Sequence, residues 1–538
     1  MIITKQSYYF IACIAISLSL SAVVLAACED FEIDGTYEGS VDLPKILFLL
    51  KYSPNEPPIP SSSEGGFAVN YAYLDTGASG ILFSRETAED MEIAIDANAQ
   101  FVDTGIAGDE YFNVSEPLYI GTADYNAANP DDPDIYYLHG PWHFQVSKEY
   151  ADSLLGEPLD VLGIPVMAGR TIVLKPVRDY NIGGIDFDDS GDDDGGDDWD
   201  LPVFTADIKD PNDPNIPQTD FQVALRFEKF ISLSNPLNLP PLPVLAYNPL
   251  IDNITVEYGG ISSKGNWLFD TGGSVSVISN DQAMALGLVD ENGDPIVEPD
   301  FYVPIGGIGG EIDLPGYTLD KLSVPTLSGF NLVFINARVC VADVTIWDED
   351  IGDFVVLDGI FGDNFICASI DTTTWDISST PFDNIVIDTQ KGLLGFDVAP
   401  EYPLPTCQFT DLDGRCGVDT GDLSVFALNW LRTDCNNANG FCDGADIDKN
   451  GRVDLGDFVL LANDWLKQDC QYPCGCQKRP YPVGDLTHNC RVDIYDLSVF
   501  AEEWLNSCDW LNFNCRDADL YRDGTVDFRD FTVFSNNW

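Results

Sequence analysis

One duplicated pattern constrains this chain more than any other feature. The sequence Leu-Asp-Thr-Gly-Ala-Ser at residues 74–79 recurs 195 residues later as Phe-Asp-Thr-Gly-Gly-Ser at residues 269–274. Each copy follows apolar, strand-like residues and runs into a second apolar stretch that ends in a serine. Such a duplication predicts two lobes that place Asp75 and Asp270 face to face. Two carboxyls that lie a hydrogen bond apart share one proton, so they can act as acid and base on one bound water.

The residues after each motif predict a helix that begins at the serine. Ser84 and Ser279 are placed as N-caps, and Ser279 with Gln282 has capping-box spacing. Residues 85–93 and 280–288 contain good helix formers. Asp-Thr-Gly occurs twice more, at residues 103–105 and 419–421, but in other surroundings. We assign those two copies no catalytic role.

The duplicated motif and its surroundings resemble the pepsin and retropepsin clan of aspartic peptidases. In that clan each lobe has an Asp-Thr-Gly loop, a flap hairpin and a later apolar-apolar-glycine segment. Candidate flaps lie at residues 105–108 and 306–310, and candidate later segments lie at 161–163 and 360–366. Residues 384–388 and 392–396 predict a closing hairpin. The resemblance implies a mainly β, bilobal, pepsin-like double β-barrel, with lobe 1 at residues 40–185 and lobe 2 at residues 244–400.

By this resemblance Asp75 and Asp270 are the catalytic residues of an aspartic endopeptidase that acts on a peptide or protein. One carboxyl would take a proton from the water while the other donates to the scissile carbonyl oxygen, and no cofactor is needed for catalysis. The resemblance gives supporting roles to Thr76, Gly77, Thr271 and Gly272. The threonines would hydrogen-bond across the lobe interface, and the glycines allow the loops to approach closely. The alternative is a non-catalytic surface adhesion or scaffold protein that uses the same fold for binding.

The third residue after each aspartate is Ala78 or Gly273, where pepsins usually have a hydroxyl. Without that donor the carboxylate is stabilised less, so we expect activity at a milder pH than that of pepsin. A Ser-His-Asp triad has few histidines to draw on, because the chain contains 3 histidines. A zinc peptidase site of the His-Glu-x-x-His type is not expected, because that motif does not occur.

The N-terminus predicts export. Lys5 precedes an apolar stretch within residues 1–27, which is typical of a secretory signal. Residues 25–28, Leu-Ala-Ala-Cys, resemble a bacterial lipobox in which Cys28 is acylated, and ordinary cleavage after Ala27 is the alternative. We therefore expect an extracellular, periplasmic or cell-surface protein, whose membrane attachment, if it has one, is an N-terminal lipid.

Composition and charge restrict the partners. The 538 residues include 89 acidic and 26 basic side chains, for a net charge of −63. Nucleic acid is excluded as a partner on this ground, because a phosphate backbone demands positive charge. Residues 186–243 form an acidic and then proline-rich linker between the lobes. Its aspartate-rich part, residues 186–198, predicts a solvated loop, with loose calcium binding as the alternative.

Residues 405–538 contain four copies of a loop followed by a helix. The first aspartates of the loops are spaced by 35, 39 and 34 residues. In the second copy, oxygen-bearing residues occupy positions 1, 3, 5, 9 and 12 and glycine occupies position 6, which is the pattern of a calcium loop. Apolar residues at helical spacing give each helix one apolar stripe. The expected calcium ligands are Asp411, Asp413, Asp419 and Asp422; Asp446, Asp448, Asn450, Asp454 and Asp457; Asp485, Asn489, Asp493 and Asp496; and Asp519, Asp523, Asp527 and Asp530.

This unit resembles the dockerin type I repeat, a calcium-dependent module that docks secreted enzymes onto cohesin-bearing partners. The resemblance implies a small α-rich, EF-hand-like domain with calcium as its cofactor and a cohesin-like partner. Because dockerins usually pair two repeats, a calcium- and disulfide-stapled stalk is one alternative, and an accessory of a polysaccharide-degrading complex is another. All twelve cysteines beyond residue 339 are expected in disulfides, including Cys470, Cys474 and Cys476, for which zinc is the alternative.

Overall fold

The computed structural model describes most of the chain. The described residues are 30–61, 66–67, 70–105, 108–148, 159–179, 202–228, 230, 237–307, 310–327, 331–348, 353–402, 412, 418, 420–435, 442, 445–447, 451–463, 484, 486, 492, 494–508, 515, 518–521 and 524–537. The predicted signal peptide, Cys28 and the acidic run at 186–198 lie outside the described residues.

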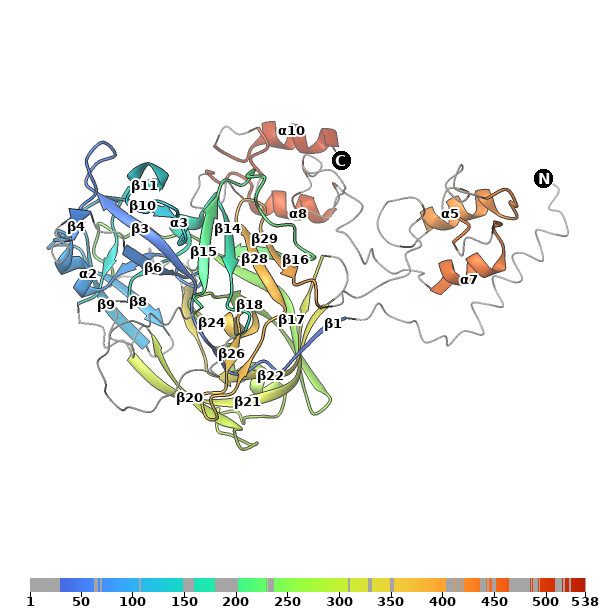
Figure 1. Ribbon diagram of the computed structural model, residues 1–538, viewed down its shortest axis with the longest axis horizontal. Helices are drawn as coiled ribbons and strands as arrows, with labels where there is room; N and C mark the ends of the chain where they lie inside the picture. Colours follow the sequence, from blue (N-terminus) through green and yellow to red (C-terminus); the bar gives the residue numbers. More distant parts are fainter. Residues whose placement is uncertain are drawn as a thin grey trace, which may run out of the picture. The chain divides into compact units, whose positions relative to one another are not determined.

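The described part of the protein is mainly β, with 42% of the described residues in strands and 14% in helices, and it contains a large mixed sheet (Figure 1). It divides into two compact units. One comprises residues 31–327, 331–404 and 478–538, and the other includes residues 405–477. In the described part of the chain, no helix has both the length and the apolar character needed to span a membrane.

We call residues 31–402 the β body. Its first half contains β3 (Lys45–Lys51), β4 (Pro60–Ser61), β5 (Gly66–Phe67), β6 (Asn70–Leu74), β7 (Ile81–Phe83), α2 (Arg85–Asp90), β8 (Phe101–Gly105), β9 (Gly108–Val114), β10 (Leu118–Ala123), the 3₁₀ helix η1 (Pro133–Ile135), β11 (Tyr137–Trp142), β12 (Gln145–Val146), β13 (Val161–Leu162), α3 (Ile164–Met167) and β14 (Thr171–Lys175).

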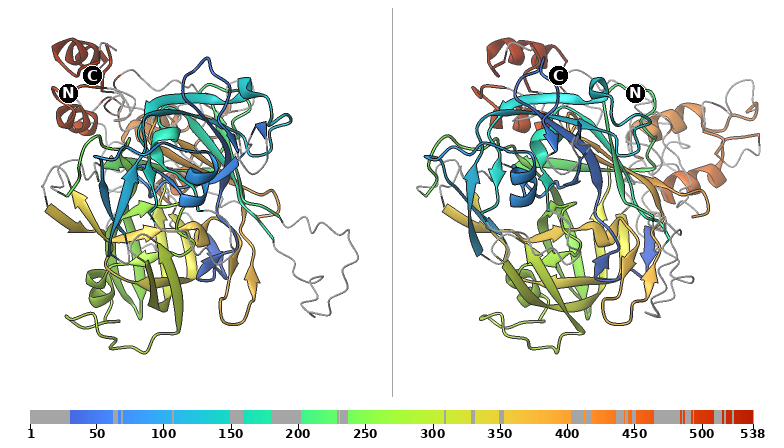
Figure 2. Two further views of the ribbon diagram at one scale, coloured as in Figure 1. Left: turned by 90° about the vertical axis from the view of Figure 1, so that its left-hand side faces the viewer. Right: turned by 60° about the vertical axis from the view of Figure 1, so that its left-hand side comes forward.

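The second half contains β17 (Asn248–Tyr258), β18 (Ile261–Phe269), β19 (Val277–Ile278), α4 (Asn280–Ala285), β20 (Phe301–Gly307), β21 (Gly310–Pro325), β22 (Asn331–Val341), β23 (Thr345–Asp348), β24 (Asp353–Val356), β25 (Gly359–Phe361), the 3₁₀ helix η3 (Asp363–Phe365), β26 (Ser369–Ile370), β27 (Ile377–Ser378), β28 (Phe382–Asp388) and β29 (Leu393–Val398). Figure 2 shows the blue and cyan strands of the first half above the yellow-green strands of the second half in both views.

Both halves repeat one strand arrangement around the aspartate loop. In the first half, β13 pairs in parallel with β6 and antiparallel with β7, so that Leu162 lies opposite Leu74. In the second half, β25 pairs in parallel with β18 and antiparallel with β19, so that Phe361 lies opposite Phe269. Each aspartate therefore leaves the end of a strand whose position a later, parallel strand fixes.

The two predicted helix starts are confirmed. Ser84 caps α2 by accepting a hydrogen bond from the N–H of Thr87, and Ser279 caps α4 by accepting one from the N–H of Gln282. The helices end at Asp90 and Ala285, earlier than the ends of the helix-forming segments. The caps fix where the chain turns after each aspartate loop, because they satisfy N–H groups that have no partner within the helix.

Hairpins occur where flaps were predicted. β8 pairs antiparallel with β9, and β20 pairs antiparallel with β21. Their tips, residues 106–107 and 308–309, lie outside the described residues. The predicted closing hairpin is confirmed, since β28 pairs antiparallel with β29.

Strands of both halves join in one antiparallel row. Its order is β15 (Thr205–Lys209), β14, β28, β29, β16 (Phe221–Glu228) and β17. β15 and β16 lie within residues 186–243, the segment predicted as a linker, so part of that segment belongs to the sheet. The row links the halves through main-chain hydrogen bonds and fixes the distance between their loops.

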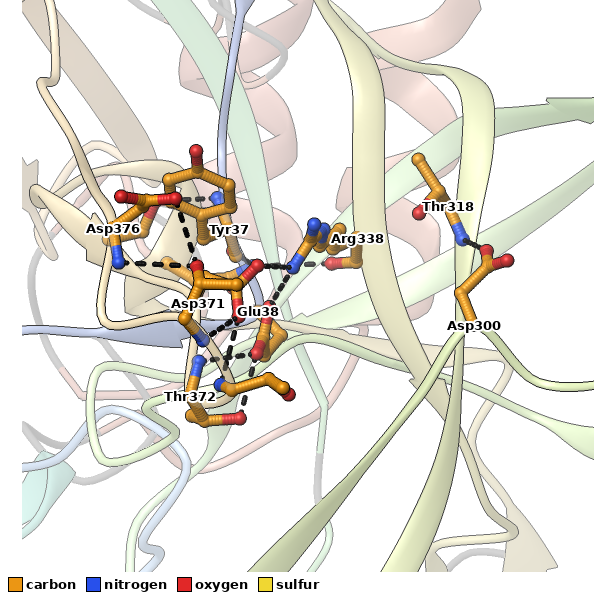
Figure 3. Close-up of polar contacts among 12 residues, drawn as sticks. Tyr37, Glu38, Asp300, Thr318, Arg338, Asp371, Thr372 and Asp376 are labelled. Carbon is orange, nitrogen blue, oxygen red and sulfur yellow. Dashed lines mark hydrogen bonds and ion pairs between the residues drawn. The ribbon is translucent and has the colours of Figure 1, made fainter.

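The N-terminal segment of the β body binds to the second half through strand pairing and ion pairs. β1 (Phe31–Asp34) pairs with β22, and β2 (Gly39–Ser40) pairs with β26. Between them, Glu38 is 1% exposed and pairs with Arg338 at 2.6 Å, and Arg338 also pairs with Asp371 at 2.8 Å (Figure 3). Because a buried carboxylate without its partner is costly, this cluster holds the segment in place.

The four predicted tail helices are α5 (Thr420–Asn429), α7 (Leu455–Asn463), α8 (Ile494–Glu502) and α10 (Phe528–Asn537). Phe426 of α5 and Leu461 of α7 belong to one core cluster, and Phe500 of α8 and Phe534 of α10 belong to another. The repeats therefore pair as first with second and third with fourth.

The disulfides follow the same division. Cys435–Cys442 lies in the first pair of repeats and Cys508–Cys515 in the second, each with a sequence separation of 7. The prediction that every cysteine beyond residue 339 is in a disulfide is wrong for Cys340 and Cys367, which are free. Both thiols are buried in the β body.

Candidate active site

The structure brings Asp75 and Asp270 together from equivalent loops. The N–H of Asp75 donates to Leu162 O at 3.0 Å, and the N–H of Asp270 donates to Phe361 O at 3.0 Å. A Cβ atom on Gly77 would lie 2.5 Å from Asp270 Cγ, and one on Gly272 would lie 2.3 Å from Asp75 Cγ. Each glycine thus abuts the aspartate of the other half, and only a residue without a side chain fits at that distance.

The electrostatics of the pair favour one shared proton. Burial raises the pKa of Asp75 well above its ordinary value, and the charge of Asp270 and a hydrogen bond with it raise that pKa further. Burial also raises the pKa of Asp270, while hydrogen bonds from Asp75 and from the N–H of Gly272 oppose that rise. Such a pair loses its two protons in two coupled steps, so a singly ionised state persists over a range of pH.

Main-chain N–H groups stabilise the negative charge of this state. The N–H groups of Gly77 and Ala78 lie 2.7 and 3.0 Å from Asp75 Oδ1, and the N–H of Gly272 lies 2.9 Å from Asp270 Oδ1. Hydrogen bonds to an ionised acceptor are about twice as strong as those between neutral groups. Asp75 and Asp270 are each half-buried as whole residues.

The two threonines cross-link the loops, as the resemblance implied. The hydroxyl of Thr76 donates to Phe269 O at 2.6 Å, and that of Thr271 donates to Leu74 O at 2.6 Å. Each hydroxyl oxygen also accepts the other threonine's N–H, at 3.0 and 3.1 Å. Both side chains are fully buried. Since the bonds run between the halves, they hold the two carboxyls at a fixed separation.

Asn248 is a site residue that the sequence reasoning missed. It begins β17 in the second half, is 2% exposed, and donates from Nδ2 to Gly77 O of the first loop at 2.8 Å. Ser79 Oγ lies 2.6 Å from Asn248 Oδ1. An asparagine at the start of a strand gives no local signal of such a contact, because its partner lies 171 residues earlier.

Asp363 is a third carboxyl beside the pair. Its N–H donates to Gly273 O at 2.8 Å, as the N–H of Ile164 donates to Ala78 O at 3.0 Å in the first half. The main chains of the halves match here, but an aspartate stands in place of an isoleucine. The side chain is fully buried, and neither carboxyl oxygen has a hydrogen-bond partner in the described structure.

Burial, with the charges of Asp270, Asp75 and Asp42, raises the pKa of Asp363 well above its ordinary value. Burial without a hydrogen-bond partner therefore favours the neutral form of this carboxyl. The signal in the sequence is a charged residue type inside the apolar stretch 360–366.

The second and fourth tail loops have matching geometry. In the second, Asp446 Oδ2 accepts the N–H of Gly451 at 3.0 Å, and Asp457 Oδ2 accepts the N–H of Asp454 at 2.8 Å. In the fourth, the corresponding distances are 2.9 Å from Gly524 to Asp519 and 2.8 Å from Asp527 to Asp530. Both glycines have positive φ, at 94° and 88°, which the sharp turn of the loop requires.

The burial of these carboxylates fits a cation. Asp446, Asp457, Asp496 and Asp530 are at most 1% exposed. Buried carboxylates are costly unless they are paired or coordinate a metal, and clustered oxygen atoms are the ligands that calcium prefers. The predicted ligands Asp411, Asp413, Asp419, Asp448, Asn450, Asp485, Asn489, Asp493 and Asp523 lie outside the described residues. Asp422 lies in α5, and its side chain is outside them.

Comparisons of this chain with protein-family models and with curated proteins found no match.

Proposed function

We propose that the β body is an exported aspartic endopeptidase with a pepsin-like, bilobal double β-barrel. The observation that carries the proposal is that Asp75 and Asp270 lie together on equivalent loops of two halves, in a setting whose electrostatics favour one shared proton. The repeated strand arrangement around each loop and the antiparallel row between the halves support it. Two intact aspartate loops also favour catalysis over an adhesion or scaffold protein that uses the fold only for binding.

In this mechanism the singly ionised pair holds a water molecule between its carboxyls. The ionised aspartate takes a proton from the water as its oxygen attacks the scissile carbonyl carbon, while the protonated aspartate donates to the carbonyl oxygen. When the tetrahedral intermediate breaks down, the C–N bond breaks and the aspartate that took the water's proton gives it to the leaving amine. The other aspartate takes back a proton from an intermediate hydroxyl as the carboxyl product forms, which restores the singly ionised pair. The cross-linked loops keep the two carboxyls in the geometry that this exchange needs.

For the tail we propose two tandem calcium-binding modules, each made of two dockerin-like repeats. Calcium would be held by Asp446, Asp454 and Asp457 in the second loop and by Asp519, Asp527 and Asp530 in the fourth. A bound cation would fix each loop against its helix, so that the module presents a rigid surface to a cohesin-like partner. The pairing of the helices into two clusters supports this proposal, because it reconciles four repeats with a two-repeat module.

The activity is tested with a diverse peptide library from pH 3 to 8, in calcium, using wild-type protein and three variants. Asp75→Asn and Asp270→Asn should each lower cleavage by at least about 100-fold, because each removes one partner of the acid–base pair. Asp103→Asn alters a third Asp-Thr-Gly copy, at the start of the first hairpin, and is the matched control. It should keep wild-type cleavage. Cleavage that survives in either dyad variant would contradict the proposed mechanism.

A further inference from the structure

We infer that Asn248 is a positioning residue: a side chain of the second half that holds the first catalytic loop and makes the two aspartate loops inequivalent. The inference rests on the proposed peptidase function. It assigns a role to a buried amide that neither the repeated motif nor the threonine cross-links explain.

The contacts of Asn248 lie directly behind Asp75. Its Nδ2 lies 2.8 Å from Gly77 O and 3.4 Å from Thr76 O. The carbonyl of Gly77 and the N–H of Ala78 belong to one peptide group, and the carbonyl of Thr76 and the N–H of Gly77 belong to another. Those two N–H groups are the ones that donate to Asp75 Oδ1. Asn248 therefore binds the far ends of both peptide groups that hold the Asp75 carboxyl.

This arrangement strengthens the bonds to the carboxyl. A hydrogen bond accepted by a peptide oxygen polarises the same peptide group and makes its N–H a better donor, by about 10–30% per bond. Ser79 fixes the amide in the required orientation, because its hydroxyl oxygen lies 2.6 Å from Asn248 Oδ1. The amide thus holds the loop in place and stabilises the negative charge of the dyad.

The corresponding position in the other half lacks this donor. The N–H of Ala246 donates to Ser79 O at 2.8 Å, and the N–H of Ser40 donates to Ser274 O at 2.7 Å, so the two segments run alike past the two loops. Two residues further on, the first segment has Asn248 and the second has Asp42. Asp42 pairs with Lys45 at 2.9 Å instead. In the described structure, the carbonyls of Thr271 and Gly272 receive no side-chain amide.

Two variants test the inference by kinetics. Asn248→Ala should lower kcat about tenfold, equal to about 1.4 kcal/mol in the barrier, and leave KM within twofold. Asn248→Asp should lower kcat more at neutral pH, because a carboxylate cannot donate to the two carbonyls and adds charge beside Asp75, Asp270 and Asp363. On acidification the new carboxyl is protonated and can donate again, so the deficit in kcat of Asn248→Asp relative to wild type should shrink. The deficit of Asn248→Ala should not depend on pH in this way.

Hydrogen exchange tests the same role without any catalytic readout. The peptide covering residues 74–83 should exchange faster in Asn248→Ala than in wild type, in full-length protein. Asn384→Ala is the matched control, since its amide binds Asp397 in the β28–β29 hairpin. It should leave both kcat and the exchange of residues 74–83 unchanged.

Several results would overturn the inference. These are unchanged kcat and unchanged exchange in folded Asn248→Ala, equal losses in Asn384→Ala, or a deficit of Asn248→Asp that does not vary with pH. A wild-type protein that cleaves no peptide would instead refute the proposed function. The exchange comparison would still decide whether Asn248 holds the loop.

Discussion

Replacing Thr271 with valine should destabilise the β body, because valine has the same shape but cannot hydrogen-bond. The substitution removes the bond from the Thr271 hydroxyl to Leu74 O and the bond from the Thr76 N–H to Thr271 Oγ1, at 2.6 and 3.1 Å. Both partners are buried, and a buried polar group left unpaired costs about 1–3 kcal/mol. Two such groups give a loss of roughly 2–6 kcal/mol in the free energy of unfolding.

Urea denaturation followed by circular dichroism measures this loss as a lower midpoint at an unchanged m-value. Thr380→Val is the matched control, because Thr380 is 3% exposed and its hydroxyl makes one bond, to Ile366 O at 3.1 Å. That variant should lose about half as much. If Thr271→Val lost no more stability than Thr380→Val, the cross-linked loops would not hold the two halves together.

Four further outcomes are expected. Burial raises the pKa of Asp160 to about 6, and a raised carboxyl pKa contributes stability that is present at low pH and lost as the pH rises through 6. Unfolding free energies should show that Asp160→Asn lacks this loss, which amounts to about 2 kcal/mol between pH 4 and 7. The pKa of Asp363 is also raised by burial, so ionisation of this carboxyl at high pH lowers the stability of wild type. Asp363→Asn should therefore keep its Tm up to a more alkaline pH than wild type does. Gly272→Ala should abolish peptide cleavage because its Cβ would lie 2.3 Å from Asp75 Cγ, whereas Gly39→Ala, with no contact under 3.6 Å, should keep it. Removing calcium with a chelator should lower the Tm of the tail. For a loop that had been in free calcium at 100 times its Kd, the loss of stability is about 2.7 kcal/mol. Asp457→Ala should reduce the fall in Tm on calcium removal.

Local signals in the sequence were sufficient for the loops and their helices. The repeated Asp-Thr-Gly motif, which forms a turn, identifies Asp75 and Asp270. Ser84 and Ser279 are identified by the hydrogen bonds that the start of a helix requires. These features depend on neighbours within a few residues, so the pattern alone could predict them.

Asn248 and Asp363 could not be assigned in this way. Each acts on a loop that is distant in sequence, and its role depends on how the two halves meet. In its local setting, neither residue type reveals whether the side chain contacts an aspartate loop or has an ordinary structural role. The predicted linker shows a different limit. β16 alternates buried and more exposed residues over Phe221–Glu228, which is a strand signal, but the surrounding prolines dominated the prediction.

The grouping of the tail repeats could have been predicted from the sequence. Cys435 and Cys508 are 73 residues apart, as are Cys442 and Cys515 and the loop aspartates Asp446 and Asp519. The unequal spacings of 35, 39 and 34 residues between successive loops do not show this longer period, which corresponds to one module of two repeats.

Binding of a transition-state mimic tests the central claim most directly. The ligand is a peptide built from the best library substrate, with a hydroxyl-bearing tetrahedral carbon in place of the scissile carbonyl, and calorimetry gives its Kd for wild type, Asp75→Asn, Asp270→Asn and Asp103→Asn. We predict that wild type and Asp103→Asn bind it at least about 100-fold more tightly than either dyad variant, because only a singly ionised pair matches the tetrahedral hydroxyl. Equal affinity in all four proteins would contradict the assignment of Asp75 and Asp270 as a catalytic pair.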